Sequence, residues 1–368
     1  MRIIHTADIH LDSKLERNLS SQLASSRRAE ILENFVSMVE YASANDVDAI
    51  LISGDLFDVK KVSANARNRV LSLIFAHSDI DFYYLKGNHD INSFLEGIED
   101  IPSNLFLFTD EWKTYSVSTS VCISGIEIDS SNNNTLYDSL FLPLDKFNIV
   151  MLHGQAGGYI SPDKAEAINL SLLKNKNIDY LALGHVHSHK EEMIDGRCLM
   201  VYPGCLDPRG FDECGEHGFV LLDIDEEAKT CSHRFVSFAS RNAVEINADL
   251  SGLFNTYEAI EKIDEEINEK GVLGKDLLKL VLTGQIDVEA DIDLLSIQKR
   301  FESGFFMFKI YDQTSVKVDF ESYLLDKSLK GEFVRVVMAR DDLSEEKKSR
   351  IISYGLSALR NEGIELCD

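Results

Sequence analysis

The sequence lacks the features that would place a protein in a membrane or outside the cell. No apolar run among its 368 residues approaches the length needed to cross a bilayer. The N-terminus has a single Arg, no long apolar segment and no small-residue cleavage site, so it does not resemble a signal peptide. None of the six cysteines forms a C-x-x-C pair, and we expect reduced packing residues rather than a zinc ribbon. These absences together predict a cytoplasmic protein.

Positive charge is also scarce. The chain has 37 Lys and Arg against 62 Asp and Glu, which gives a formal net charge of −25. Proteins that bind nucleic acid usually present a basic face, because their affinity comes largely from neutralising phosphates. The charge therefore argues against stand-alone DNA binding. Bound metal ions could still supply local positive charge at a phosphodiester, and a partner protein could bind the rest of the nucleic acid.

What the first half contains is one pattern repeated five times, in which an apolar, β-branched run ends in side chains that can bind metals. The runs have the length and composition of strands. Amphipathic stretches at 25–46 and 63–77 separate the first three runs, and the order strand, helix, strand predicts parallel pairing in an α/β core. The five runs are RIIHTADIH (2–10), DAILISGDLFD (48–58), DFYYLKGNHD (81–90), NIVMLHG (148–154) and DYLALGHVH (179–187).

In an α/β core, ligands collect at the carboxyl ends of the strands. If the five runs share a sheet, their polar ends meet on one rim. Imidazole and carboxylate suit divalent transition metals, and seven such ligands are too many for one tetrahedral zinc. They suit two ions bridged by one carboxylate, and Asp55, on a central strand after a glycine, is the natural bridge. The predicted metal-binding residues are Asp8, His10, Asp55, Asn88, His153, His185 and His187.

Strand alternation at the first run predicts that Asp8 and His10 point to the same side and that Ile9 points away. Five other histidines have no comparable support, and for each of them we favour a structural role. These are His5, His77, His189, His217 and His233.

The five motifs, D-x-H, G-D, G-N-H-D, a lone His and G-H-x-H, occur in this order between residue 1 and about residue 190. They resemble the calcineurin-like metallophosphoesterase superfamily, which implies a four-layer αββα sandwich and two divalent ions, with Mn²⁺ as the expected metal. The resemblance implies phosphodiester hydrolysis by a metal-bridged hydroxide, with His89 as catalytic histidine, Asp90 orienting it and Asp58 supporting the metal ligands. One ion would be held by Asp8, His10, Asp55 and His187, and the other by Asp55, Asn88, His153 and His185.

Three stretches, IIHTADIHLDS (3–13), GDLFD (54–58) and YPGCLDPRGFDECGEHGFVLLDI (202–224), resemble the DNA-repair exonuclease branch of this superfamily, the SbcD and YhaO-like nuclease subunits. This finer resemblance implies a DNA exonuclease or endonuclease subunit that works with an SbcC-like coiled-coil ATPase, and it leaves a homodimer open. In the last stretch, Pro203 and Gly204 are expected to form a turn, and Arg209 is a candidate for contact with a substrate phosphate.

The composition changes near residue 240, which predicts a metallophosphoesterase domain over 1–240. Residues 241–315 have the pattern of alternating strands and helices of a small α+β cap domain, which in SbcD-like nucleases lies over the active-site rim and handles DNA. Residues 316–368 predict C-terminal helices, the last beginning at Ser344 and ending before Gly363. By resemblance these helices bind the ATPase, although an intramolecular helical tail fits the pattern equally well.

Three functions fit these observations. A nuclease subunit is favoured by the cap and by residues 202–224. A metallophosphatase or phosphodiesterase for a small phosphorylated molecule uses the same ligands and fits the acidic charge better. A non-catalytic scaffold on the same fold predicts that metal ligands have been lost, whereas all seven are present.

Overall fold

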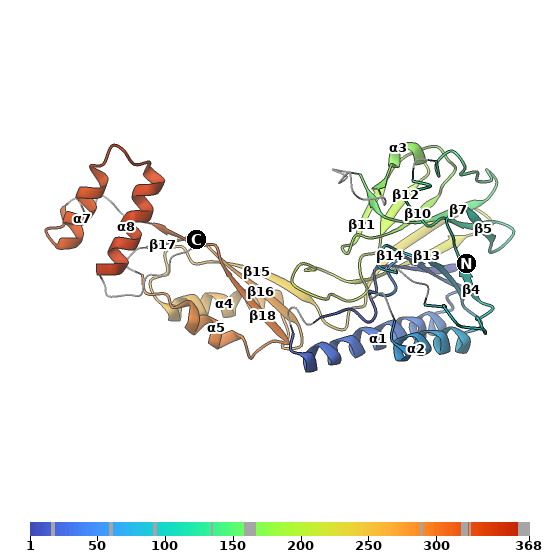
Figure 1. The fold of residues 1–368 in the computed structure, drawn as a ribbon, viewed down its shortest axis with the longest axis horizontal. Helices are drawn as coiled ribbons and strands as arrows, with labels where there is room; N and C mark the ends of the chain where they lie inside the picture. Colours follow the sequence, from blue (N-terminus) through green and yellow to red (C-terminus); the bar gives the residue numbers. More distant parts are fainter. Residues whose placement is uncertain are drawn as a thin grey trace. The chain divides into compact units, whose positions relative to one another are not determined.

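The computed structural model divides the chain into two compact units, Met1–Asn242 and Ala243–Asp368. Each unit is described by itself, and Figure 1 gives the element labels. No helix in the described part of the chain combines the length and apolar character needed to cross a membrane. The structure describes residues 1–15, 19–58, 62–90, 94–133, 135–157, 167–287, 290–317, 323 and 325–359.

The first sheet of the N-terminal unit has β1 and β2 at its centre. Strands β1 to β4 run parallel, β13 runs antiparallel to β1, and β14 runs antiparallel to β13. Helices α1 (Ser21–Ala44) and α2 (Ala64–Ala76) make the crossovers that this parallel order requires. Ser20 and Ser63 cap their N-termini, as serines at this position usually do. The strand order is β14 (Thr230–Ser237), β13 (Gly218–Asp225), β1 (Arg2–Thr6), β2 (Ala49–Ser53), β3 (Asp81–Leu85), β4 (Leu105–Leu107).

The second sheet also has a parallel centre, formed by β6, β7, β10 and β12, with one antiparallel strand at each edge. Its strand order is β11 (Lys190–Met193), β12 (Leu199–Tyr202), β10 (Tyr180–Gly184), β7 (Phe147–His153), β6 (Val121–Gly125), β5 (Lys113–Ser116). A short pair, β8 (Gln155–Ala156) with β9 (Ala167–Ile168), follows β7.

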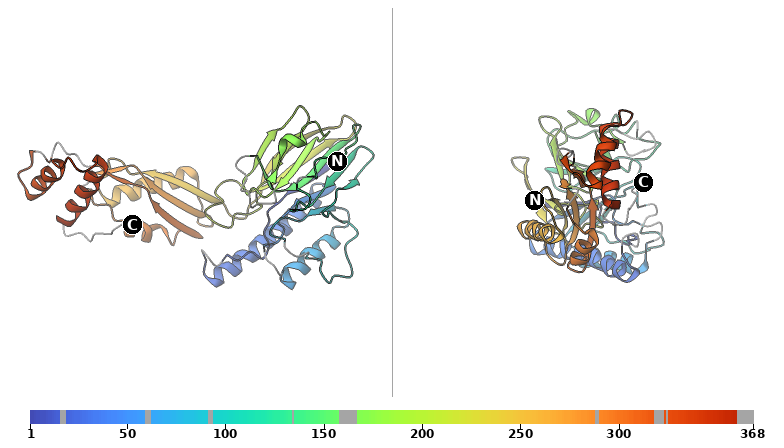
Figure 2. Two further views of the ribbon diagram at one scale, coloured as in Figure 1. Left: turned by 45° about the horizontal axis from the view of Figure 1, so that its top comes forward. Right: turned by 90° about the vertical axis from the view of Figure 1, so that its left-hand side faces the viewer.

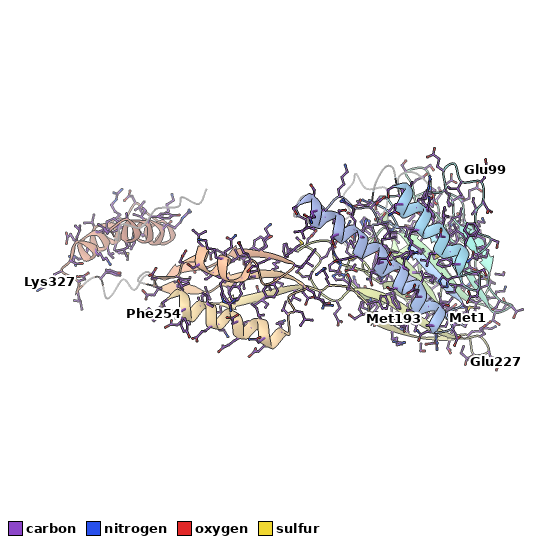
Figure 3. The ribbon with its side chains drawn as sticks, turned by 90° about the horizontal axis from the view of Figure 1, so that it is seen from below. Met1, Glu99, Met193, Glu227, Phe254 and Lys327 are labelled. Carbon is purple, nitrogen blue, oxygen red and sulfur yellow. The ribbon has the colours of Figure 1, made fainter. Side chains whose placement is uncertain are left out.

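The two sheets stack face to face. A core between them combines Ile3 and Leu51 of the first sheet with Ile123 and Ile149 of the second. Helices α1 and α2, blue in Figures 1 and 2, cover the outer face of the first sheet. Figure 3 views the molecule from below, so that these two helices lie in front of that sheet. Among the described residues, the outer face of the second sheet is covered by loops and the short α3 (Leu170–Leu173). This confirms the αββα sandwich, with a thin fourth layer.

The C-terminal unit begins with the predicted alternation of strands and helices. All three strands of its main sheet, in the order β15-β16-β18, run parallel, because each connecting helix returns the chain to the same end. The elements are β15 (Ala243–Asp249), α4 (Thr256–Lys270), β16 (Leu277–Thr283), α5 (Leu294–Phe301) and β18 (Met307–Asp312), with a small pair of β17 (Gln285–Asp287) and β19 (Ser315–Lys317).

Two helices follow, α7 (Leu329–Met338) and α8 (Glu345–Leu359). They share a small core of their own, which includes Val334 and Ile352. Helix α8 begins directly after Ser344, as predicted, and the Ser344 hydroxyl accepts a hydrogen bond from Lys347 N. The predicted end of this helix before Gly363 lies outside the described residues.

Candidate metal centre

The polar ends of the five runs meet at one edge of the N-terminal unit, but they come from two sheets rather than one. Strands β1, β2 and β3 belong to the first sheet, and β7 and β10 belong to the second. The two sheets are joined at this edge by the ring of His153, whose Nδ1 lies 2.9 Å from Ser53 O at the end of β2. The five runs therefore do not share one sheet, and they still meet because the two stacked sheets of the sandwich bring their carboxyl ends to the same edge.

The side chains of Asp8 and His10 lie together, and Ile9 packs in the core beneath α1 and α2. Strand alternation does not produce this arrangement, because β1 ends at Thr6. Instead, Asp8 and His10 both adopt a left-handed backbone, each with φ 52°. Their amides donate to Gly54 O and Asp55 O at 3.0 and 2.9 Å. Such a backbone is uncommon outside glycine and costs about 1–3 kcal/mol per residue, so neighbouring contacts must impose it.

Glycines precede the ligands because the crowded edge leaves no room for a Cβ. At Gly54, which has φ +94°, a Cβ would lie 2.1 Å from His153 Nδ1. At Gly87 it would lie 2.2 Å from Asp55 Oδ1, although the φ of Gly87 is ordinary. Close approach to a neighbouring strand end therefore requires glycine at both positions.

The first predicted ligand group is brought together. One oxygen or nitrogen from each of Asp8, His10 and His187 lies within 4.8 Å of the others. His10 Nε2 lies 3.1 Å from His187 Nε2 and 3.8 Å from Asp55 Oδ2. The Asp8 carboxylate also accepts from His185 N at 2.9 Å, which joins the first and fifth runs.

The second predicted ligand group lies beside the first. Asn88 Oδ1 is 3.1 Å from His153 Nε2 and 3.3 Å from His185 Nδ1. Asp55 Oδ2 is 3.4 Å from His153 Nε2, on the same carboxylate that approaches His10. Asp55 therefore approaches both groups, as its predicted bridging role requires, and the Asp8 carboxylate also lies within 4.8 Å of Asp55 and His153.

The donor set suits divalent cations. The Nδ1 atoms of His153 and His187 are bonded to Ser53 O and to Glu213 Oε1, which leaves their Nε2 lone pairs directed into the cluster. Lone pairs of imidazoles and carboxylates thus converge on a small buried volume, an arrangement that a cation stabilises. Burial raises the pKa of Asp8 to about 6, and a bound cation would reverse that effect. The residues present therefore fit the two ions implied by the sequence.

His89 lies beside this cluster with its side chain 44% exposed. Its Nδ1 lies 2.5 Å from Asp58 Oδ1, and this hydrogen bond raises the pKa of His89. The His89 ring packs edge-on against the His10 ring at 5.0 Å between centroids. Asp58 is held in turn by the Ser13 hydroxyl at 2.7 Å. We expected Asp58 to support metal ligands. Its carboxylate instead makes the contact that orients the His89 ring.

Asp90, which was expected to orient His89, instead accepts three backbone hydrogen bonds. Its carboxylate accepts hydrogen bonds from Phe57 N at 2.8 Å, from Gly87 N at 3.1 Å and from Leu56 N at 3.2 Å. Burial, followed by the nearby Asp55 charge, raises the pKa of Asp90 to about 6. Asp90 therefore ties the loop after β2 to the loop after β3.

Sequence reasoning missed Glu213. This carboxylate is 4% exposed and lies 2.7 Å from His187 Nδ1. Arg209, the candidate for phosphate contact, donates from Nη2 to Glu213 at 2.8 Å and from Nη1 to Asp58 at 3.2 Å. The stretch 202–224 contained both residues, but a Glu in a glycine-flanked turn has the pattern of a surface residue. Only its burial against His187 distinguishes it.

The remaining histidines have local partners. His5 Nδ1 lies 2.9 Å from the Tyr180 hydroxyl, and His217 Nε2 lies 2.7 Å from Glu213 O. His233 pairs with Glu191, and His77 follows the last turn of α2. His189 Nδ1 lies 3.0 Å from Tyr202 O. The five cysteines that the structure describes are all thiols.

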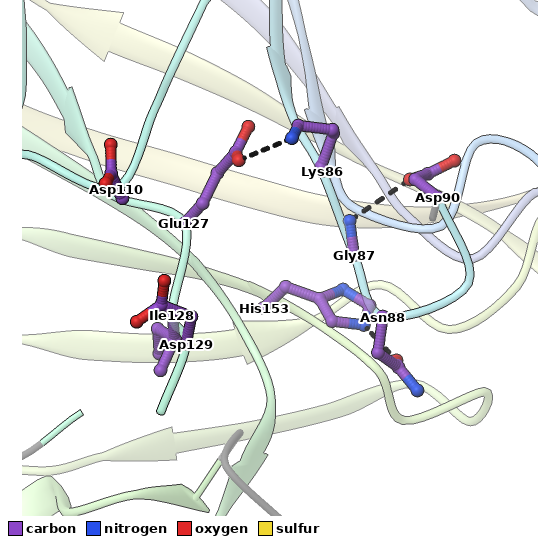
Figure 4. A pocket seen from close by; sticks show the side chains of 9 residues that line it. All are labelled: Lys86, Gly87, Asn88, Asp90, Asp110, Glu127, Ile128, Asp129 and His153. Carbon is purple, nitrogen blue, oxygen red and sulfur yellow. Dashed lines mark hydrogen bonds and ion pairs between the residues drawn. The ribbon is translucent and has the colours of Figure 1, made fainter. Parts of the chain in front are cut away.

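A pocket of about 290 Å³ adjoins the second ligand group, with Asn88 and His153 in its wall (Figure 4). Asp110, Glu127 and Asp129 also line it, and Glu127 pairs with Lys86 at 2.8 Å. Because carboxylates outnumber the one Lys, this pocket disfavours an additional phosphate and suits a neutral group of a substrate.

A family model described as calcineurin-like phosphoesterase matches residues 1–189, a range that contains all seven predicted ligands and His89. The DNA double-strand break repair protein Mre11 of Sulfolobus acidocaldarius is 26% identical over 316 residues, which cover 81% of this chain and 79% of that protein. The Mre11 protein of Saccharolobus solfataricus is 24% identical over 96% of this chain and 93% of its own. The uncharacterized metallophosphoesterase YhaO of Bacillus subtilis is 27% identical over 61% of this chain and 57% of its own.

Proposed function

Because the chain belongs to the calcineurin-like phosphoesterase family, we propose that this metal-dependent phosphoesterase is a two-metal phosphodiesterase and a DNA exonuclease or endonuclease subunit of the SbcD type. The convergence of seven metal-competent side chains at one edge supports the two-metal site. The similarity to proteins named for DNA double-strand break repair supports the DNA substrate. It extends over 96% of the chain in one relative and so includes the C-terminal unit.

Two subsets of ligands would hold the ions. When bound, two divalent ions, Mn²⁺ in our proposal, supply the positive charge that attracts a phosphate and offsets the negative charge of the transition state. The subsets are Asp8, His10, Asp55 and His187 for one ion, and Asp55, Asn88, His153 and His185 for the other.

His89 is the proposed proton donor to the leaving oxygen. Its Nδ1 is engaged by Asp58, so Nε2 is the atom that carries the transferable proton. The same carboxylate raises the pKa of His89, which keeps more of the ring protonated near neutral pH. Its partly exposed position lets a substrate reach it, whereas the buried His10 is out of reach.

The C-terminal unit would serve the partner and the substrate. We propose residues 241–315 as a cap that handles DNA and residues 316–368 as the segment that binds an SbcC-like coiled-coil ATPase in the cytoplasm. Leu329, Val336 and Ile351 of α7 and α8 are 71%, 58% and 40% exposed, an apolar surface of the kind that partners cover. A partner of this kind would also compensate for the net charge of −25.

A small phosphoester is the second candidate substrate. The acidic lining of the pocket beside Asn88 favours it, because a neighbouring phosphate of a DNA strand would be repelled there. Hydrolysis of a small ester uses the same seven ligands and needs no partner.

The deciding experiment presents both substrates to the full chain. Purified protein with Mn²⁺ is given single-stranded DNA, double-ended DNA and p-nitrophenyl phosphate esters, with and without the ATPase. We expect Mn²⁺-dependent cleavage of DNA that is abolished by a chelator. If DNA stays intact in both conditions while a small ester is hydrolysed, the nuclease assignment is wrong and the phosphatase assignment replaces it.

A further inference from the structure

We infer that Arg209 and Glu213 are positioning residues that hold the metal ligand His187 and the proton donor His89 at a fixed spacing. This inference rests on the proposed metal centre and adds two residues to it. Both lie beyond residue 189, where the family match ends.

Glu213 fixes the orientation of His187. Its Oε1 lies 2.7 Å from His187 Nδ1, so a proton on Nδ1 is held by the carboxylate and Nε2 is left to bind metal. Arg209 Nη2 lies 2.8 Å from the same Oε1, and the guanidinium charge favours the ionised form of this carboxyl. A charged carboxylate behind a ligating imidazole sets the tautomer and makes Nε2 a stronger donor.

Asp58 plays the corresponding part for His89. Its Oδ1 engages His89 Nδ1 at 2.5 Å, and its Oδ2 lies 3.2 Å from Arg209 Nη1. The two histidines are therefore each backed by a carboxylate, and Arg209 lies between the two carboxylates.

The guanidinium of Arg209 is occupied by these two carboxylates, and its Nη2 also lies 3.3 Å from His187 Nδ1. Nη2 and Nε lie 2.8 and 3.2 Å from Glu213 Oε1, while Nη1 reaches Asp58. Its side chain is 17% exposed. A planar guanidinium presents its donors in a rigid fork, so it fixes the separation of two carboxylates as well as their charge. This geometry argues for positioning and against the direct phosphate contact that we expected from the sequence.

The segment that carries both residues is itself tied to the loop of His187. Cys205 N donates to His187 O at 3.1 Å, and a Cβ on Gly204 would lie 2.9 Å from the same oxygen. Arg209 N donates to Glu213 Oε2 at 2.6 Å. Backbone and side-chain contacts of this segment bind the same loop. A substitution at Glu213 should therefore alter the position of His187 more than that of any other metal ligand.

The test compares Mn²⁺ binding with turnover in the full chain. Isothermal titration with Mn²⁺ and steady-state hydrolysis of bis-p-nitrophenyl phosphate are measured for wild type, Glu213→Gln, Arg209→Met and Arg209→Lys. Arg197→Met is the matched control, since Arg197 pairs with Asp179 at 2.7 Å but contacts no predicted metal ligand. Thermal unfolding without metal identifies any variant that fails to fold. Glu213→Gln and Arg209→Lys replace each side chain by one of similar size, so these two variants leave no cavity.

We expect Glu213→Gln to weaken Mn²⁺ binding at one of the two sites, the one that His187 helps to form, by about 10–100-fold. Binding at the other site should change little. Arg209→Met should lower kcat by at least about 10-fold with KM within about 2-fold, and Arg209→Lys should recover only part of the loss because it restores charge without the fork. Arg197→Met should match wild type in both measurements.

Two results would overturn the inference. One is a Glu213→Gln protein that folds and binds both Mn²⁺ ions as tightly as wild type. The other is an Arg209→Met protein whose KM rises while kcat and Mn²⁺ affinity are kept, which would make Arg209 a substrate contact. A wild-type protein that binds no Mn²⁺ would instead reject the proposed metal centre itself.

Discussion

The metal-competent edge of the N-terminal unit and the α7–α8 pair of the C-terminal unit are built in contrasting ways. At the edge, Asp8, His10 and Asp55 are buried, charged or polar, and all three have left-handed backbones. In the helical pair, the backbone is regular and a small apolar core forms between the helices. Backbone strain and buried polar groups occur where many neighbours impose them, while short helices keep a regular backbone and draw most of their stability from packing an apolar face.

The difference separates two kinds of function. At the edge, two of the ligands have a second partner, Ser53 O behind His153 and Glu213 behind His187, which limits how far these side chains can rearrange. On α7 and α8, exposed apolar side chains have room to accept a partner. We therefore expect substitutions at the edge to affect metal binding and catalysis, and substitutions on the helical pair to affect association.

The largest effect is expected from Asp55→Ala. Because Asp55 approaches both ligand groups, this change should empty both Mn²⁺ sites and reduce ester hydrolysis by about 10³-fold or more. Asp8→Ala should empty the first site before the second. Isothermal titration distinguishes the two variants, and equal loss of both ions in Asp8→Ala would contradict the assignment of ligands.

His89→Ala should separate catalysis from metal binding. The ring is partly exposed and its Nδ1 is held by Asp58, so its removal should leave both Mn²⁺ sites intact while kcat falls by about 10²–10⁴-fold. His77→Ala, at the end of α2, is the matched control. Retained turnover in His89→Ala would show that another group donates the proton.

A pair of glycine substitutions compares the crowded edge with an open position in the C-terminal unit. An added Cβ at Gly87 meets Asp55 at 2.2 Å, so Gly87→Ala should displace the bridging carboxylate and weaken Mn²⁺ binding. Gly271, after α4, has φ +65° and open space, so Gly271→Ala should cost only about 1–2 kcal/mol. Titration with Mn²⁺ and thermal unfolding are measured for both variants. If Gly87→Ala binds Mn²⁺ as tightly as wild type, the crowding at Gly87 does not control the position of Asp55.

The Asp58→Asn variant should shift the pH dependence of turnover. The Asp58 carboxylate raises the pKa of His89, so its removal lowers that pKa. A proton donor is lost as the pH rises through its pKa, and the basic limb of the kcat profile should therefore move to lower pH. An unmoved basic limb would assign it to a group other than His89.

The smallest effect on hydrolysis is expected from Val336→Glu. This residue is 58% exposed on α7, so the isolated protein should fold and hydrolyse a small ester at the wild-type rate. Binding to the coiled-coil ATPase, measured by titration, should weaken by at least about 10-fold if the residue lies in the contact. Unchanged affinity would remove this face of α7 from the proposed interface.

Several features of the fold could be read from the sequence because they depend on local chemistry. Apolar β-branched runs predicted the strands, and the amphipathic stretches predicted the helices between them, although α1 begins at Ser21, before the predicted start at residue 25. The pattern after residue 240 predicted the alternating strands and helices of the C-terminal unit. The five motifs identified the family because a metal site requires particular residue types at particular positions.

The sequence by itself therefore determined which side chains could bind metals and in what order they occur. Only the tertiary structure decided that the ligands come from two stacked sheets, that Asp58 rather than Asp90 contacts the His89 ring, and that Glu213 backs His187. Even the shared direction of Asp8 and His10 depends on their amides binding the end of β2 rather than on strand alternation. These features arise from contacts between segments far apart in the chain, which local propensity and spacing do not encode.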